Sequence, residues 1–170
     1  KQLKEHLADN DTQAAQDLLA QATQSLAPRK VRLCDNPAVD ALLASKVSQC
    51  AELEIPLKVN VVVPELSDIP DAELCAVFAN LIDNALDAAT SAQLPEGEKP
   101  TVELVLGEDL RSWFFSVRNN GPTIPEKQRA KIFEPGFTTK RTGQGMGLFI
   151  VNQTVTELGG RITVDSHDGD

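Results

Sequence analysis

The apolar residues of this chain follow two different spacings, and each spacing predicts one type of element. In residues 37–53 and 72–90 they recur every three or four positions, which indicates two amphipathic helices. In residues 55–64, 101–106 and 112–117 they alternate with polar residues, which indicates strands. The last two strands lie on either side of a short stretch that begins with glycine, so we expect them to form an antiparallel hairpin.

Five further patterns complete the expected order of elements. Residues 1–27 carry an apolar stripe at helical spacing, and either a partner helix or the core of the domain can bury such a stripe. Residues 31–34 and 161–166 are expected to form strands, the first of them short. Residues 126–132 are expected to form a short helix and residues 146–155 a longer one.

Composition and charge narrow the class of protein. The 170 residues suffice for one full domain, and an apolar fraction of 41% can fill one core. The net charge is −9 without a basic cluster, which argues against a nucleic-acid surface. No apolar stretch approaches the roughly 20 residues that cross a bilayer, so we expect no membrane contact by this segment. The spacing of Cys34, Cys50 and Cys75 suits neither zinc nor a disulfide framework, and we interpret them as buried thiols.

The helix expected over residues 72–90 carries three polar residues on one stripe. At about 100° per residue, Asn80, Asn84 and Asp87 fall together at the edge of the apolar face. Asparagine is a mediocre helix former because its amide competes for backbone hydrogen bonds, so two of them one turn apart require a reason. One reason is metal binding, since an amide oxygen is a ligand for hard cations such as Mg²⁺. The alternative is a solvated polar face.

A glycine-rich stretch precedes the helix expected over residues 146–155. Gly143, Gly145 and Gly147 stand at alternate positions, which predicts a loop whose backbone can approach a ligand closely. The N–H groups and the dipole of a helix start favour phosphate at such a junction. Lys140 and Arg141 are the nearest cations, and they are either phosphate contacts or ordinary surface residues.

Three runs of the chain resemble the motifs of a known family, in the same order. Residues 80–85, 118–125 and 133–148 are similar to the asparagine box, the first glycine box and the phenylalanine box with its ATP lid. These motifs belong to the ATP-binding domain shared by bacterial histidine kinases, gyrase, the ninety-kilodalton heat-shock chaperone and the mismatch-repair ATPases. The resemblance is closest to the histidine kinases and covers about residues 31–166. It implies an α/β two-layer sandwich of the Bergerat type, a mixed sheet with helices on one face, preceded by a helical segment.

The resemblance also implies a site for ATP and Mg²⁺ between the asparagine-box helix and the lid. Asn84 is expected to ligate Mg²⁺ with Asn80 beside it, and Asn80 and Lys140 are expected to take part in catalysis. The residues expected to bind the nucleotide are Asn80, Asn84, Asp87, Asn119, Gly121, Thr123, Phe133, Thr138, Thr139, Lys140, Arg141, Gly143, Gly145, Met146, Gly147 and Leu148.

Three positions bear on affinity and on the type of reaction. Asn119 stands where the family has an Asp that accepts the adenine amino group, and Thr123 replaces a glycine. A charge-assisted bond is thereby lost, so a degenerate scaffold without nucleotide affinity is one alternative. Asn80 stands where the hydrolysing members carry a general-base Glu. Because an amide takes no proton, transfer to a protein nucleophile is favoured over an ATPase clamp of the gyrase or mismatch-repair kind.

The parent protein implied by the resemblance is a two-component sensor histidine kinase. Residues 1–27 are expected to be the end of its dimerisation hairpin, and residues 28–170 its catalytic domain. The γ-phosphate would pass to a histidine on the helices of the homodimer, then to a response regulator, in the cytoplasm below an anchor in the bacterial inner membrane. Neither His6 nor His167 has the context of that histidine. The family continues with one more strand, so a chain that stops at Asp170 is either truncated or lacks it.

The expected lid, residues 138–145, has almost no apolar side chain. We therefore expect nothing to anchor it to the core without a ligand. Its ordering costs roughly 1–2 kcal/mol of backbone entropy per residue, which phosphate contacts can offset. Mg-ATP should accordingly order it more than ADP does.

Overall fold

The computed structural model describes residues 32–108, 112–140 and 143–167. The chain divides into two units, Lys1–Arg32 and Leu33–Asp170, and nearly all described residues belong to the second. The helix expected over residues 1–27, with His6, lies outside the described residues, and so does Arg141. Within the described residues, no helix is both long and apolar enough to span a bilayer.

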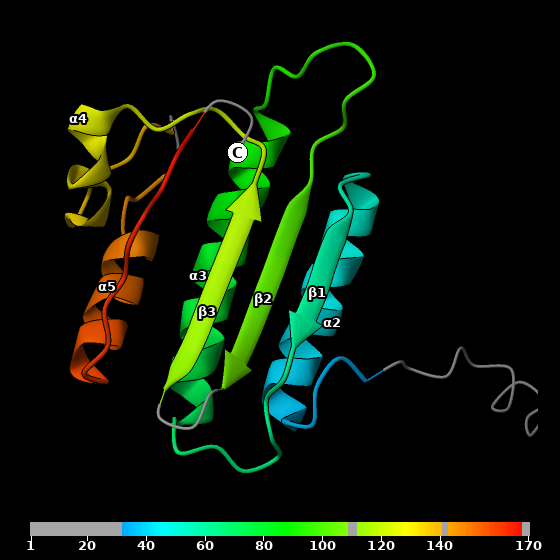
Figure 1. Cartoon of the computed structure of the whole chain (residues 1–170), viewed down its shortest axis with the longest axis vertical. Helices are drawn as coiled ribbons and strands as arrows, with labels where there is room; N and C mark the ends of the chain where they lie inside the picture. Colours follow the sequence, from blue (N-terminus) through cyan, green and yellow to red (C-terminus); the bar gives the residue numbers. More distant parts are fainter. Residues whose placement is uncertain (1–31, 109–111, 141–142, 168–170) are drawn as a thin grey trace, which may run out of the picture. The chain divides into compact units, whose positions relative to one another are not determined.

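Three strands form one mixed sheet in the order β1-β2-β3 (Figure 1). Strand β1 (Leu57–Val61) runs parallel to β2 (Val102–Glu108), with Leu57 opposite Val102. Strand β3 (Trp113–Asn119) runs antiparallel to β2, with Asn119 opposite Val102. The structure therefore confirms the three alternating segments as strands and the last two as a hairpin.

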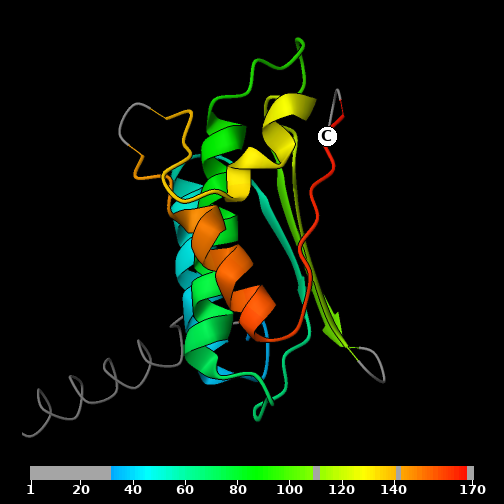
Figure 2. The same cartoon turned by 90° about the vertical axis from the view of Figure 1, so that its left-hand side faces the viewer.

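The long helices all lie on one side of this sheet, as Figure 2 shows. They are α2 (Pro37–Glu52), α3 (Asp71–Thr90) and α5 (Gly147–Glu157). Two short turns of helix, α4 (Glu126–Arg129) and η1 (Lys131–Phe133), connect β3 to the segment before α5. The expected two-layer sandwich, with helices on one face of a mixed sheet, is confirmed.

Helix α3 lies at the centre of the helical layer and contacts α2, α5 and the strands β2 and β3. Its buried surface is wider than the predicted apolar stripe, because it is covered from both sides as well as by the sheet. Leu81 and Ala88 belong to the three-to-four-residue apolar spacing of residues 72–90, which predicts a place in the core, but both are only half-buried. The buried residues of α3 are Leu74, Val77, Phe78, Ile82, Ala85, Leu86 and Ala89.

Polar contacts fix α3 against α2 at two levels. The fully buried Asn36 caps α2 by accepting from the N–H groups of Ala38 and Val39, and its amide donates to Asp71 at the start of α3 over 2.7 Å. One level further along, Lys46 of α2 forms an ion pair with Asp83 of α3. These contacts fix the start of α3 and a point next to its polar stripe against α2.

Two predicted strands are not strands in the structure. Residues 32–34 and 161–166 have no regular structure, and residue 31 lies outside the described part. The second segment is held through a side chain instead of a backbone ladder. Buried Ser166 accepts from the N–H of Ile124 over 2.8 Å, and its carbonyl oxygen accepts from the Arg129 guanidinium over 2.6 Å. An alternating pattern is compatible with this extended path, but strand pairing also needs an adjacent backbone in register.

Candidate functional site

The polar stripe of α3 faces the first residue of α5. A Cβ atom placed on Gly147 would lie 3.0 Å from Asn80 Oδ1 and 3.4 Å from Asn84 Nδ2. Glycine at this position therefore allows the backbone of α5 to start close to the two asparagines. The Asn80 amide donates its Nδ2 proton to the Ala76 carbonyl over 2.8 Å, which fixes the amide and turns Oδ1 toward the helix start.

The N-terminus of α5 has the features of an anion-binding helix start. Met146 occupies the cap position, and its own side chain accepts no hydrogen bond from the first N–H groups. Those groups have no partner within the helix, and the helix dipole adds positive potential beside them. An oxyanion placed between the asparagines and this terminus would accept from the backbone N–H groups.

Lys140 brings a positive charge to the same place. Its ammonium group donates to Asn84 Oδ1 over 3.3 Å and forms an ion pair with Asp87. The Lys140 and Asp87 side chains are 43% and 54% exposed, so both remain accessible to a ligand. One exposed ion pair therefore links the start of the expected lid to α3, and the ordering of the lid by Mg-ATP stays a prediction.

Close backbone contacts hold the described residues of the expected lid. The Gly136 N–H donates to the Gly145 carbonyl over 3.0 Å, and both glycines have positive φ, +79° and +68°. A Cβ on Gly145 would lie 2.4 Å from the carbonyl carbon of Gly136, and one on Gly143 would lie 2.7 Å from Thr138 Oγ1. Thr138 Oγ1 also accepts from the Lys140 N–H over 3.0 Å, which helps to direct Lys140. Side chains larger than hydrogen would open this arrangement.

The end of β3 approaches the same helix from the sheet side. Asn119 Oδ1 accepts from the Gly121 N–H over 2.9 Å, so the chain turns sharply after the strand. A Cβ on Gly121 would lie 2.7 Å from both the carbonyl carbon and the Cβ of Ala88 on α3. An amide oxygen has two lone pairs, so Asn119 can still accept a second hydrogen bond. This turn lies one helical turn beyond the asparagines, because Ala88 follows Asn84 by four residues.

The other predicted site residues take several positions. Thr123 follows the turn, and its hydroxyl donates to the His167 carbonyl over 3.5 Å. Phe133 and Leu148 are half-buried, Thr139 is exposed, and Met146 is 37% exposed. The structure thus gathers Asn80, Asn84, Asp87, Lys140 and Gly147 around one point, whereas Thr123 faces the C-terminal segment.

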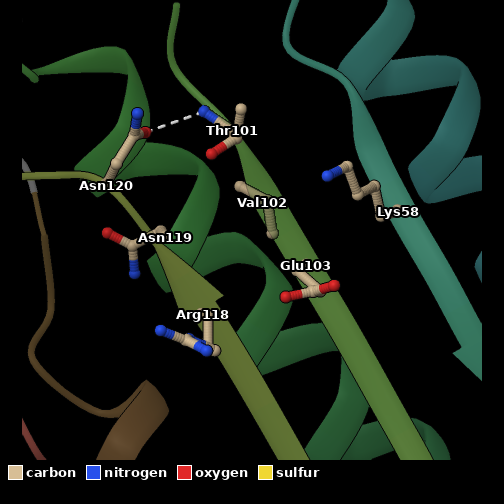
Figure 3. A pocket seen from close by; sticks show the side chains of 7 residues that line it. All are labelled: Lys58, Thr101, Val102, Glu103, Arg118, Asn119 and Asn120. Atoms are coloured by element: carbon tan, nitrogen blue, oxygen red, sulfur yellow. Dashed lines mark hydrogen bonds between the residues drawn. The ribbon is translucent and has the colours of Figure 1, made fainter. Parts of the chain in front are cut away.

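A second asparagine in the first glycine box has a role that the sequence did not reveal. Asn120 Oδ1 accepts from the Thr101 N–H over 2.8 Å (Figure 3). The Asn120 Nδ2 donates to the Lys99 carbonyl over 2.9 Å. It therefore ties the start of β2 to the end of β3. The adjacent pair Asn119-Asn120 was the available signal, since one asparagine at a strand end is often an acceptor for the next turn.

A pocket of about 300 Å³ lies among the strands, apart from the α3 stripe. It is lined by Lys58, Thr101, Val102, Glu103, Arg118, Asn119 and Asn120 (Figure 3). Its lining contains none of the residues around Lys140. We therefore place the candidate site by its converging polar groups and assign no ligand to this pocket.

The donors around Lys140 suit a hard cation. Asn80 and Asn84 offer neutral amide oxygens, and Asp87 offers a carboxylate. Among the residues that the structure describes, no three His, Cys, Asp or Glu side chains are placed to hold a metal ion. Mg²⁺ at phosphate sites takes only one or two protein oxygens and completes its shell with phosphate and water. The donor set therefore fits Mg²⁺ bound together with a phosphate ligand.

Comparison with known proteins decides between the possible phosphate ligands. The sequence profile of the histidine kinase-, DNA gyrase B-, and HSP90-like ATPases matches residues 71–170, more than half of the chain. The chain belongs to this ATPase family. The matched part contains α3, the end of β3 and the start of α5, and the family expected from the three boxes is confirmed.

Curated relatives assign the chain to the histidine kinase branch. A probable C4-dicarboxylate sensor kinase of Halalkalibacterium halodurans is 37% identical over 136 residues, which are 77% of this chain and 25% of that protein. The sensor histidine kinase DpiB of Escherichia coli strain K12 is 33% identical over 181 aligned positions, with 98% of this chain and 30% of that protein covered. The chain thus spans between a quarter and a third of the length of these relatives.

Solved structures agree with this assignment. The catalytic domain of histidine kinase ThkA matches with a TM-score of 0.64 at 26% identity, covering 79% of this chain and 86% of that one. A mycobacterial sensor histidine kinase, MprB, matches with a TM-score of 0.60 at 26% identity, covering 75% and 81%. The ATPase-family fold is therefore that of a sensor histidine kinase ATP-binding domain, and the gyrase-like alternative is not favoured.

Proposed function

We propose that this chain binds Mg-ATP between α3 and the described residues around Gly136 and Gly145, and transfers the γ-phosphate to a histidine of its parent kinase. The observation that carries the proposal is the convergence of three phosphate-directed features. The N-terminus of α5 and the Lys140 ammonium group supply positive potential, and the Asn80 and Asn84 amides lie between them. Each feature is common, but their meeting at one point is not expected of a solvated surface.

Each side chain has a distinct task in this proposal. Lys140 would hold the terminal phosphates as a point charge, and the first N–H groups of α5 would hold the phosphate oxygens. Asn84 Oδ1, with Asn80 Oδ1 beside it, would bind Mg²⁺, which when bound neutralises charge on the β- and γ-phosphates. Asn119 would accept the adenine amino group at the end of β3.

Asn80 also supports transfer in preference to hydrolysis. Its Nδ2 proton is engaged by the Ala76 carbonyl, and its Oδ1 is an amide oxygen that cannot remove a proton from water. Phosphoryl transfer needs positioning and electrostatic stabilisation more than covalent participation by the protein. We infer that the nucleophile comes from another part of the parent protein.

The proposed partners follow from the names of the relatives, which are sensor kinases. The acceptor histidine would lie on dimerisation helices of a homodimeric parent, whose end we assign to residues 1–27, and residues 28–170 would form the catalytic domain. A response regulator would receive the phosphoryl group. We place the domain in the cytoplasm of a kinase anchored in the bacterial inner membrane.

Labelling with γ-phosphate-labelled ATP and Mg²⁺ tests the transfer. We expect no label on the chain alone, because His6 and His167 lack an acceptor context, and acid-labile label on an added dimerisation hairpin of the parent kinase. Asn84→Ala should abolish labelling with an unchanged circular dichroism spectrum. Asn60→Ala, an exposed asparagine on β1, is the matched control and should retain it. Acid-labile label on His6, or a fully active Asn84→Ala chain, contradicts the proposal.

A further inference from the structure

The ammonium group of Lys140 occupies the oxygens that would otherwise attract a metal ion. It donates to Asn84 Oδ1 over 3.3 Å and pairs with the Asp87 carboxylate. Asp87 lies three residues after Asn84, so both side chains project from the same face of α3. The sequence predicted that all three residues contact the nucleotide, but the structure shows that they contact one another.

This arrangement disfavours a second cation at the same oxygens. Like charges a few ångströms apart repel strongly near a protein surface, where the effective dielectric constant is well below that of water. The ion pair with Lys140 also cancels the negative charge of Asp87. Asn84 Oδ1 alone is a neutral donor, and Mg²⁺ gives up its water reluctantly. With Lys140 in place, the site therefore offers little to a divalent metal.

A nucleotide changes this balance. Its phosphates carry several negative charges, and a lysine ammonium group binds phosphate as a point charge. Lys140 is 43% exposed, and its four-carbon stem can move without leaving a cavity in the core. Moving it to the phosphates would release Asn84 and Asp87 at the moment when the phosphates themselves add metal ligands.

We propose that Lys140 is the built-in cation of this site, and that a divalent metal enters only together with the nucleotide, which draws Lys140 away from Asn84 and Asp87. Asp87 then carries the negative charge that Lys140 masks until the nucleotide arrives. The inference rests on the proposed function for the identity of the ligand. It adds an order of events to that function: the metal does not bind first.

Manganese binding to the full chain tests the proposal without any measurement of activity. Mn²⁺ is the probe, and the enhancement of water-proton relaxation reports the bound ion. Without nucleotide, we expect only weak binding to the wild-type chain. Lys140→Met removes the charge but keeps the stem, and it should bind Mn²⁺ about tenfold more tightly or better. The double variant Lys140→Met with Asp87→Asn should lose this gain.

The other ion pair of α3 provides the matched control. Lys46→Met removes the same charge from the partner of Asp83. Lys46 also donates to an amide oxygen, that of Gln49 over 3.3 Å, but it is only 14% exposed between α2 and α3, so this variant should gain no comparable Mn²⁺ binding. An unchanged Mn²⁺ affinity in Lys140→Met overturns the proposal, and so does an equal gain in Lys46→Met.

Addition of ATP separates this inference from the proposed function. The wild-type chain should bind Mn²⁺ when ATP is added. If ATP brings no Mn²⁺ to the wild-type chain while Lys140→Met still gains affinity, the proposed function is wrong and the role of Lys140 in excluding the metal stands. If the wild-type chain already binds Mn²⁺ tightly without ATP, the order of events is wrong.

Discussion

Single residues in the asparagine stripe combine a structural contact with an open functional group. The Asn80 amide bonds the carbonyl four residues earlier, which offsets the poor helix propensity of asparagine and directs its oxygen toward Gly147. Asn84 faces Gly147 with its amide nitrogen and Lys140 with its oxygen. The identity of these side chains could be predicted from the sequence. Their direction could not, because it depends on hydrogen bonds formed within the folded helix.

At the same scale, two thiols make stability depend on pH. Burial is the main cause that raises the pKa of Cys50 and Cys75 above the ordinary value of 9.0. For Cys50, the charge of Lys46 lowers the pKa and that of Asp83 raises it. For Cys75, the charge of Asp71 raises the pKa further. A thiol with a raised pKa in the folded state ionises more readily in the unfolded chain. The free energy of unfolding should therefore be steady below about pH 8 and fall as the pH rises through 9.

Urea denaturation between pH 7 and pH 9.5 measures this effect. The chain has no tyrosine, so no phenol titrates in this range. A variant with Cys50→Ala and Cys75→Ala should be less stable at pH 7, because the buried Cys50 and the half-buried Cys75 side chains are truncated, but its stability should decline less with pH. The same decline in both proteins would show that other groups cause it.

Two glycines allow close contacts with neighbouring residues, and the neighbours differ in how easily they can move. A Cβ on Gly121 would meet the backbone and the Cβ of Ala88 at 2.7 Å, and α3 cannot move away because α2, α5 and the sheet surround it. A Cβ on Gly107 would meet the Phe114 ring at 2.4 Å, but this ring is 51% exposed and can rotate into solvent. A side chain at Gly107 should therefore cost less stability than one at Gly121, although its nearest contact is shorter.

Gly121→Ala should thus destabilise the chain by about 1–3 kcal/mol, the usual cost of overpacking a well-filled contact. Gly107→Ala should stay within about 1 kcal/mol of the wild type, since alanine also reduces the entropy of the unfolded chain. Chemical denaturation of both variants gives the comparison. An equal loss of stability in the two would mean that the Phe114 ring is as fixed as the α3 backbone.

Periodicity predicted the elements that have one buried face. It failed where side-chain contacts or additional neighbouring elements determine the local structure and its burial. Strands β1, β2 and β3 and helices α2, α3 and α5 were all found from their spacing. The alternation in residues 161–166 was misleading, because Ser166 fixes that segment to Ile124 and Arg129 by side-chain contacts. The buried surface of α3 was underestimated, because no sequence pattern shows that a helix will have neighbours on both sides.

At the scale of the whole molecule, the site joins parts of the chain that are far apart in sequence. Lys140 lies 53 residues after Asp87, yet the two side chains form an ion pair. In this acidic chain, with net charge −9, the positive potential among the described residues of the site comes from Lys140 and the N-terminus of α5. The family motifs predicted which residues take part. Only the fold shows that Lys140 is already paired with the residues that would hold the metal.

Nucleotide binding with and without Mg²⁺ is the measurement that tests the central claim most directly. We expect the wild-type chain to bind ATP more tightly with Mg²⁺ than without it, and Asn84→Ala to bind in both conditions at the level of the wild-type chain without Mg²⁺. The difference should be about tenfold, or 1.4 kcal/mol, if one metal ligand is lost. Isothermal titration calorimetry gives both affinities. No binding of ATP by the wild-type chain, or an Asn84→Ala chain that responds to Mg²⁺ as the wild type does, would contradict the account.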